Sequence, residues 1–258
     1  MSILKLVKFN LKIEKKKIFL WCISSFIIIF IYMILFPYVQ DVAKVEMEMM
    51  PEELLKLFGI DSYKDLGNYN NYFESIYNIF IVAISIYAVI YTVNLIEKEE
   101  KNKTLEFMYS LSITRNNIII SKILVAIIAI TSIIFFSFFS VAICGSINGG
   151  DSYNVMEIFK ICLNSLLITY VYIAVGIFLG GCYISRADSE IGAGITVVMY
   201  LSGVISTMLS EKYEFIKYLS PFEVIKYNDL PTLLTYLAIC SVLISIGVIR
   251  YNKRDFKI

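Results

Sequence analysis

The sequence predicts an all-α membrane protein with six transmembrane helices. Six long runs hold no Asp, Glu, Lys or Arg, and they cover residues 18–40, 75–96, 123–150, 161–185, 191–210 and 230–249. Each run is about as long as the ~20 residues that a helix needs to cross a hydrocarbon core of ~30 Å. Of the 258 residues, 58% are hydrophobic and 15% aromatic, which differs from the composition of soluble proteins. Because little of the chain lies outside the runs, residues 1–258 are expected to form a single transmembrane domain.

The distribution of charge predicts which side of the membrane each connecting segment faces. With the N-terminus inside, 16 of the 23 Lys and Arg fall on inner segments, whereas 14 of the 22 Asp and Glu fall on outer segments. This is the positive-inside pattern, and it predicts that both termini are cytoplasmic. The basic residues are therefore a topology signal and not a nucleic-acid footprint. The composition, rich in Ile, Lys and Asn, indicates an AT-rich bacterial genome, so we expect a multi-pass protein of a bacterial plasma membrane.

The N-terminal segment is expected to form an interfacial helix before the first span. In residues 2–16, a helical rotation of 100° per residue places the Lys side chains on one face and most apolar side chains on the other. A basic amphipathic helix of this kind suits the membrane interface, and an ordinary basic flank without a fixed helix is the alternative. The first span follows at about 18–36 and is closed by Pro37. It is expected to be retained, because no small-residue cleavage site of a signal peptide follows it.

Two outer segments are predicted to be more than plain loops. Residues 38–74 are acidic, and Pro51 and Gly59 suit the first turn and the end of a short surface helix. The Asn-rich stretch 67–72 then reads as a loop. Residues 210–230 mix aromatic and charged side chains, a composition that suits an interfacial hairpin.

The remaining spans are predicted at about 76–96, 118–143, 160–183, 191–209 and 232–249. Small residues in the fourth span predict a close contact with another helix, and they are Gly176, Gly180 and Gly181. Gly176 and Gly180 match the small-x-x-x-small pattern that lets two helix backbones approach. The chain has no His, and its five Cys occur singly, so we expect no metal site and treat the thiols as packing groups.

The sequence lacks the motifs that several classes of enzyme and transporter require. The sequence has no G-x-x-x-x-G-K-[ST] phosphate loop, no H-E-x-x-H and no G-x-S-x-G. The charge-free runs also lack the ionisable side chains that mark proton-coupled transport. We therefore expect neither an enzyme nor a proton-driven transporter, and no cofactor bound by this chain. A transport machine with this membrane part would take its energy from another subunit.

The most informative segment is the hydrophilic loop predicted at residues 97–117, between the second and third spans. Thr104 could cap a short helix over residues 105–111, in which Leu105, Met108 and Leu111 share one stripe. A short, partly apolar cytoplasmic helix held between two spans suits a docking element. The alternative, which the residues alone leave equally open, is a solvated connector packed on its own spans.

This loop resembles the one between the second and third spans of ABC-2-type transporter permeases. Their pattern is close to E-x-x-x-G-T-L-E-x-L-L-S-L-P-[IV]-[ST]-R, followed by a Lys in the third span, and this chain reads EEKNKTLEFMYSLSITR. The matching residues are Glu99, Thr104, Leu105, Glu106, Ser110, Leu111, Ile113, Thr114, Arg115 and Lys122. Lys103 replaces the usual Gly and Ser112 the usual Pro. The stretches 51–59 and 218–222 also resemble family elements, so the resemblance covers the whole chain.

The resemblance implies a division of labour between subunits. A separate ABC ATPase subunit would bind ATP and Mg and hydrolyse the ATP. Residues 103–115 would form the coupling helix seated in that subunit, with contacts from Glu99, Thr104, Leu105, Glu106, Met108, Leu111 and Arg115. Two permease subunits, as a homodimer or a heterodimer, would form the path for a hydrophobic or amphiphilic cargo. Antimicrobial peptides, lipids or drugs are the expected cargo, which would connect the protein with antibiotic resistance.

A second hypothesis belongs to a different functional class. The chain would be a non-transport immunity or sensing protein that binds a ligand through its acidic outer segment, residues 38–74. The association of an ATPase subunit with this chain distinguishes the two hypotheses.

Overall fold

The computed structural model describes residues 2–45, 67–102, 113–182, 188–208, 211–226 and 230–254. Within these ranges the chain is helical almost throughout. The longer helices are α1 (Ile3–Ile34), α4 (Tyr69–Lys101), α6 (Arg115–Asn148), α7 (Val155–Cys182), α8 (Asp188–Met208) and α10 (Leu230–Lys253). Shorter elements are α2 (Phe36–Val45), η2 (Gly150–Ser152), η3 (Glu211–Leu219) and α9 (Pro221–Lys226). Six of the described helices are long and apolar enough to cross a membrane, which confirms the predicted fold class.

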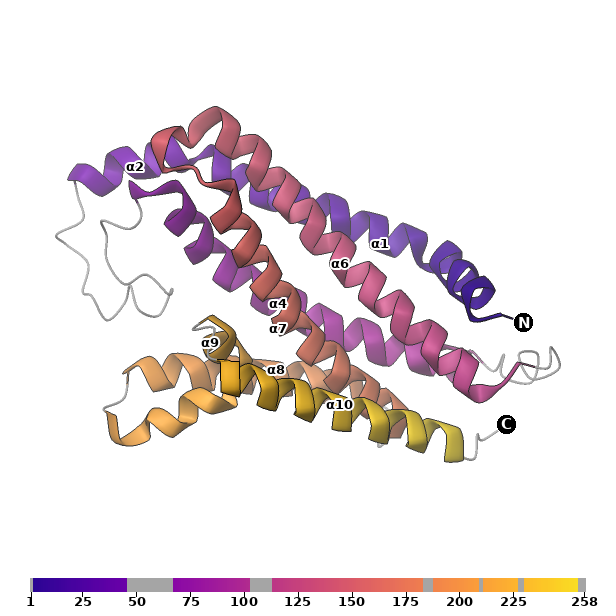
Figure 1. Ribbon diagram of the computed structural model, residues 1–258. Coiled ribbons are helices and arrows are strands. Elements are labelled where there is room, and N and C mark those ends of the chain that lie inside the picture. Colours follow the sequence, from indigo (N-terminus) through magenta and orange to yellow (C-terminus); the bar gives the residue numbers. More distant parts are fainter. Residues whose placement is uncertain are drawn as a thin grey trace.

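The six long helices form one elongated bundle in which α4 and α7 are central (Figure 1). Helix α4 packs against α6, α7 and α8, and α7 also packs against α6 and α10, while α1 lies along α6. More than half of the apolar stretch is buried in α4, α6 and α7, against 11% in α10. Both termini lie at the same end of the bundle, which we call the terminal end. The other end carries α2 and the connection between α6 and α7.

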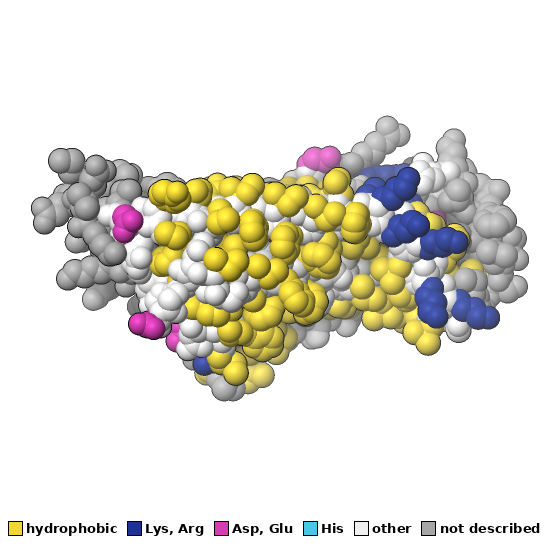
Figure 2. All heavy atoms as spheres, turned by 90° about the horizontal axis from the view of Figure 1, so that it is seen from above, with side chains coloured by type: hydrophobic (Ala, Val, Ile, Leu, Met, Phe, Trp, Pro, Cys, Tyr) yellow, Lys and Arg dark blue, Asp and Glu magenta, His cyan; other side chains and the backbone are white. Residues whose placement is uncertain are grey.

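The outer surface of the bundle matches a lipid environment. Figure 2 shows a broad apolar face with Lys and Arg gathered toward one end. Apolar side chains are exposed along this surface, among them Ile28 and Ile31 on α1 and Phe135 on α6. Such a band would be an aggregation surface in water, whereas acyl chains of a bilayer cover it without cost.

The N-terminal segment differs from the separate interfacial helix that the sequence predicts. Residues 3–34 form one uninterrupted helix, because this stretch holds no Gly or Pro to break it. Its 32 residues are about 48 Å long at 1.5 Å each, so the helix is longer than a hydrocarbon core of ~30 Å. The buried side chains of its first half include Leu6, Asn10 and Glu14, while the apolar Leu4 and Ile13 are exposed.

The long helices also extend beyond the predicted spans. Helix α4 begins at Tyr69 and ends at Lys101, so the stretch 67–72 that was predicted as a loop contains its first turn. The Asn68 side chain caps this turn by accepting hydrogen bonds from the backbone N–H groups of Asn70 (2.9 Å) and Asn71 (3.4 Å). Helix α6 likewise begins at Arg115, after the N-cap Thr114. The charge-free runs therefore coincide with the long helices but do not mark where these helices end.

The segments predicted to face the outside contain short helices. Helix α2 starts at Phe36 with Pro37 in its first turn, a position that suits Pro because no backbone N–H is needed there. The segment predicted as a hairpin at 210–230 contains η3 and α9 instead. The predicted surface helix at 51–59 lies outside the described residues.

Aromatic rings and neutral hydrogen bonds hold the end opposite the termini. The Tyr69 ring is fully buried and meets Phe36 and Tyr153 edge-on, with ring centroids 5.1 Å and 5.6 Å apart. Its hydroxyl donates to the Val141 carbonyl at 2.9 Å. The Tyr153 ring closes this cluster against Gly145, where a Cβ atom would come within 2.2 Å of the ring. We call this group, with Tyr72, the aromatic end.

Candidate functional site

The structure describes the two flanks of the predicted coupling loop. Glu99 lies in the last turn of α4, and Arg115 is the first residue of α6. The five predicted coupling residues between them lie outside the described residues, and they are Thr104, Leu105, Glu106, Met108 and Leu111. Residues 97–101, predicted as the opening of the loop, are helical. The connection between the two helices is therefore shorter than predicted and starts within the terminal end of the bundle.

Charged side chains from four segments meet around the end of α4. We call them the charged cluster, and it consists of Glu14, Glu97, Lys98, Glu99, Glu100, Lys101, Arg115, Lys122 and Arg254. Helix α4 contributes five consecutive members, Glu97 to Lys101. The others come from α1, from α6 and from the residue that follows α10. The members from other segments contact the end of α4 or the start of α6, which are the two flanks of residues 103–112.

The most buried contact of the charged cluster is between α6 and α4. The Lys122 side chain is fully buried, and its ammonium forms an ion pair with the Glu99 carboxylate. It also donates a hydrogen bond to the Ile96 carbonyl at 2.9 Å. Lys122 is the Lys that the loop motif places in the third span, directly before the charge-free run 123–150, so this predicted span holds one ionisable side chain. The charge is tolerated because both a carboxylate and a carbonyl compensate for its lost hydration.

A second ion pair connects α1 to α4. Glu14 is 3% exposed and receives the Lys98 ammonium, while Lys17 lies 3.5 Å from its other oxygen. One turn earlier on α1, the Asn10 amide donates to the Ser121 hydroxyl of α6 at 3.3 Å. These buried polar contacts explain why α1 keeps its helical path to residue 3 beside the other helices.

The C-terminal segment completes the cluster. The Arg254 guanidinium pairs with Glu100 and also donates to the Gly180 carbonyl of α7 at 3.4 Å. Arg115 donates to the carbonyls of Asn252 at 3.1 Å and of Arg254 at 2.7 Å. Burial lowers the pKa of Arg254 from its usual value, but a guanidinium remains charged at neutral pH. The end of α10 is thereby held to the start of α6 and the end of α4.

This geometry binds the two flanks of residues 103–112 to α1, α6 and the end of α10. The model of a protein family described as "ABC-2 family transporter protein" matches residues 12–256 of the chain. The chain belongs to the ABC-2 transporter family. None of the curated proteins searched matches it. Family membership confirms the resemblance found in the loop motif and makes the chain a multi-pass membrane component of a transporter.

The predicted glycines of this ABC-2 transporter chain lie at two helix contacts. Gly176 faces α4, where a Cβ atom would come within 2.8 Å of the Thr92 Cβ. Gly180 also faces α4, where a Cβ atom would lie 3.3 Å from the Val93 Cα. Gly181 instead faces α10, where a Cβ atom would come within 2.3 Å of the Gly247 carbonyl oxygen. Helix α7 thus approaches α4 and α10 on neighbouring faces.

Sequence reasoning did not identify several residues of this site. Glu14, Lys98 and Arg254 were assigned only to topology, and Gly247 was not singled out as the partner of Gly181. One signal was present, because Glu14 is the only acidic residue among six Lys in residues 1–17. An isolated acid in a basic segment suggests a buried partner. Glu14 and Lys98 are 84 residues apart in sequence, and Arg115 and Arg254 are 139 residues apart, so these contacts can be identified only from the fold.

Proposed function

We propose that this chain is the permease subunit of an ABC exporter whose ATP is hydrolysed by a separate ATPase subunit. Residues 103–112 act as the coupling segment, because Thr114 and Arg115 of the predicted coupling helix are the N-cap and the first residue of α6. The ATP and Mg remain on the partner. Two permease subunits, identical or related, form the path, and the cargo is hydrophobic or amphiphilic. The observation that carries this proposal, together with family membership, is the charged cluster. It attaches the flanks of residues 103–112 to α1, α4, α6 and α10.

The charged cluster supports a mechanical role for these flanks. A displacement of residues 103–112 acts on Lys101 at one side and on Arg115 at the other. Because Glu99, Glu100 and Lys98 are paired with other helices, the displacement moves those helices together. Packed helices respond to such forces by rigid-body shifts rather than by local deformation. ATP-driven closure of the partner subunits would in this way rearrange the translocation path.

A double substitution tests this function. Leu105→Asp with Leu111→Asp alters no membrane span, so the chain should still insert. It should lose the ATPase subunit on co-purification, or retain it with cargo-stimulated ATP hydrolysis abolished, since two buried apolar contacts of roughly 1–3 kcal/mol each become unfavourable. The matched control is Ser146→Asp with Asn148→Asp, which adds the same charge at the opposite end of the bundle. Normal transport by the Leu105/Leu111 variant would contradict the coupling role and favour a sequestering protein.

The orientation is tested by thiol labelling. In a variant without the five native Cys, Asn102→Cys should resist an impermeant reagent in intact cells, because positive-inside charge places the terminal end in the cytoplasm. Ser146→Cys, exposed at the opposite end, should react. The reverse labelling pattern would overturn the assigned orientation.

A further inference from the structure

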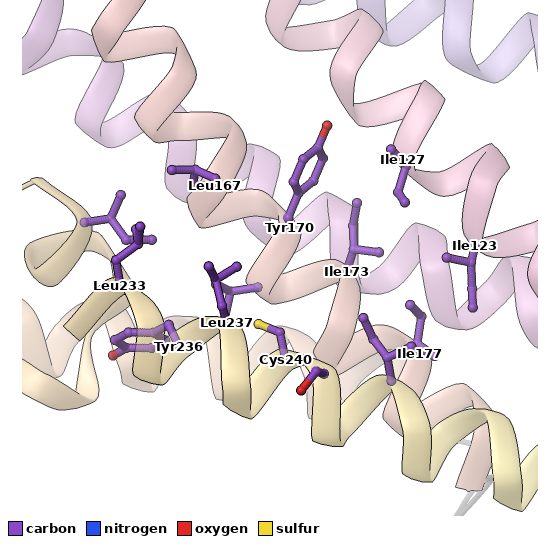
Figure 3. A pocket seen from close by; sticks show the side chains of 14 residues that line it. Ile123, Ile127, Leu167, Tyr170, Ile173, Ile177, Leu233, Tyr236, Leu237 and Cys240 are labelled. Atoms are coloured by element: carbon purple, nitrogen blue, oxygen red, sulfur yellow. The ribbon is translucent and has the colours of Figure 1, made fainter. Parts of the chain in front are cut away.

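A groove of about 300 Å³ opens between α6, α7 and α10, and Ile225 of α9 also lines it. Figure 3 shows Ile127 of α6, Tyr170 and Ile173 of α7, and Leu237 and Cys240 of α10 around it. The volume lies at the lower end of the ~300–1,000 Å³ that is typical of small-molecule sites. None of the residues that line the groove belongs to the charged cluster, and neither the family description nor the proposed coupling assigns the groove a role.

The polar atoms in the groove wall are already paired within the protein. The Tyr170 hydroxyl lies 2.8 Å from the Thr131 hydroxyl, and the Tyr236 hydroxyl donates to the Tyr218 carbonyl at 2.8 Å. The Ser241 hydroxyl donates to a carbonyl one turn earlier on α10, at 2.7 Å. Apart from the weakly polar Cys240 thiol, the remaining lining side chains are hydrocarbon. The wall therefore selects an apolar chain, because a polar ligand group would lose its hydration without gaining a partner.

The place of the groove indicates where that chain comes from. All three helices are membrane-spanning by length and composition, so acyl chains surround the groove in a bilayer. Along α10 it extends from Leu233 to Ile244, about 16 Å at 1.5 Å per residue. This length is close to half of the ~30 Å hydrocarbon core, the depth of one leaflet. A second helix, ~10–12 Å in diameter, is too wide to enter a hollow of this volume.

We propose that the groove binds one acyl chain of a bilayer phospholipid, with the headgroup outside it. The chain fills the space between α10 and the helices α6 and α7. The acyl chain would cover part of α10, because only 11% of the apolar stretch of this helix is buried within the protein. The inference does not depend on coupling to an ATPase, so it can fail or hold separately from the proposed function.

Native mass spectrometry of the full-length chain, extracted from phospholipid nanodiscs, tests the proposal. The wild type should retain one phospholipid per chain, with equal occupancy for phosphatidylglycerol and phosphatidylethanolamine of the same chain length. Cys240→Trp fills the groove and should lower that occupancy at least tenfold. The matched control is Ile239→Trp, the neighbouring residue on α10, which is 52% exposed and does not line the groove. It should retain the lipid.

A graded series keeps the test valid if the largest side chain prevents folding. Occupancy should fall in the order Cys240, Cys240→Leu, Cys240→Phe, following side-chain volume. Unchanged occupancy across the series, or a wild type that retains no phospholipid, would overturn the proposal. So would a bound molecule of another class, which would make the groove a cargo site. A Cys240–Cys240 disulfide formed in membranes would show that a second copy covers it, and would also overturn the proposal.

Discussion

Different kinds of interaction hold the helices together at the two ends of the bundle. At the terminal end, the ion pairs Lys122–Glu99 and Arg254–Glu100 join α6 and the residue after α10 to the end of α4. At the aromatic end, α2 and α4 meet through edge-on rings, and the Tyr69 hydroxyl of α4 donates to the Val141 carbonyl of α6. Ring packing tolerates small shifts, because dispersion is summed over many weak contacts. A buried ion pair tolerates separation poorly, because each ion then loses compensation for its lost hydration.

This difference fits the direction in which force would pass through a transporter of this family. The terminal end surrounds the segment proposed to touch the ATPase subunit, and there the helices must move as one body. The aromatic end lies at the opposite end of the bundle. There the helices need to stay packed together, but they do not need to transmit force. Four substitutions test the comparison, and the expected effects decrease from the first to the last.

The largest effect is expected at Lys122. Lys122→Met removes the cation that pairs with the largely buried Glu99 carboxylate, and breaking one partner of a buried pair costs about 3–5 kcal/mol. The thermal unfolding midpoint in detergent should fall sharply. Adding Glu99→Met should restore much of that stability, because an apolar pair of similar volume replaces the ions.

The restored double variant separates stability from coupling. It should fold and bind the ATPase subunit, but cargo-stimulated hydrolysis should remain low because α4 and α6 are no longer joined by charge. If the double variant transports normally, the ion pair serves stability alone. If it is no more stable than Lys122→Met, the two residues do not act as a unit.

The second effect concerns the approach of α7 to α10. In Gly181→Ala, the added methyl group meets the Gly247 carbonyl, a backbone group that cannot rotate away. Overpacking of this kind typically costs about 1–3 kcal/mol. The shift should also displace Arg254, whose guanidinium contacts the adjacent Gly180 carbonyl. Gly194→Ala is the control, since a Cβ atom there meets nothing within 4 Å. Equal unfolding midpoints for the two variants would exclude a tight α7–α10 contact.

The spans could be predicted from the sequence because a bilayer imposes a length on apolar runs. The helix ends could not be predicted, because the change in hydropathy marks the membrane boundary and not the last backbone hydrogen bond of the helix. Glu97 illustrates the difference. It was predicted to open a loop, but it lies within α4 and pairs with Lys101 one turn later, at 2.8 Å. Polar residues that pair along a helix continue it beyond the hydrocarbon core.

The candidate site was predicted in part, through the loop motif that includes Glu99 and Arg115. The motif did not reveal that Glu99 contacts Lys122, although both residues belong to it. That contact depends on the packing of α4 against α6, which no local pattern encodes. The groove at Cys240 was likewise not predictable, since side chains of several helices define it, and α6, α7 and α10 each have the sequence of an ordinary apolar span.

A smaller effect is expected at the aromatic end. Tyr69→Phe retains the buried ring and its contacts with Phe36 and Tyr153, and removes only the hydroxyl that donates to Val141. A hydrogen bond of this kind contributes about 1 kcal/mol net. The thermal midpoint should therefore fall slightly, and cargo-stimulated ATP hydrolysis should not change. Loss of coupling in this variant would show that both ends transmit force, contrary to the comparison.

The smallest effect is expected at the edge of the charged cluster. The Lys17 side chain is 70% exposed and lies 3.5 Å from Glu14, whereas Lys98 pairs with the other oxygen of the same carboxylate. An exposed ion pair contributes about 0–1 kcal/mol, because water and salt screen it. Lys17→Ala should therefore leave the unfolding midpoint nearly unchanged at any salt concentration. Lys98→Ala, in contrast, should lower it, because Glu14 stays buried and loses the cation that joins α1 to α4. Equal loss from the two substitutions would mean that total charge at this end, rather than buried pairing between helices, stabilises it.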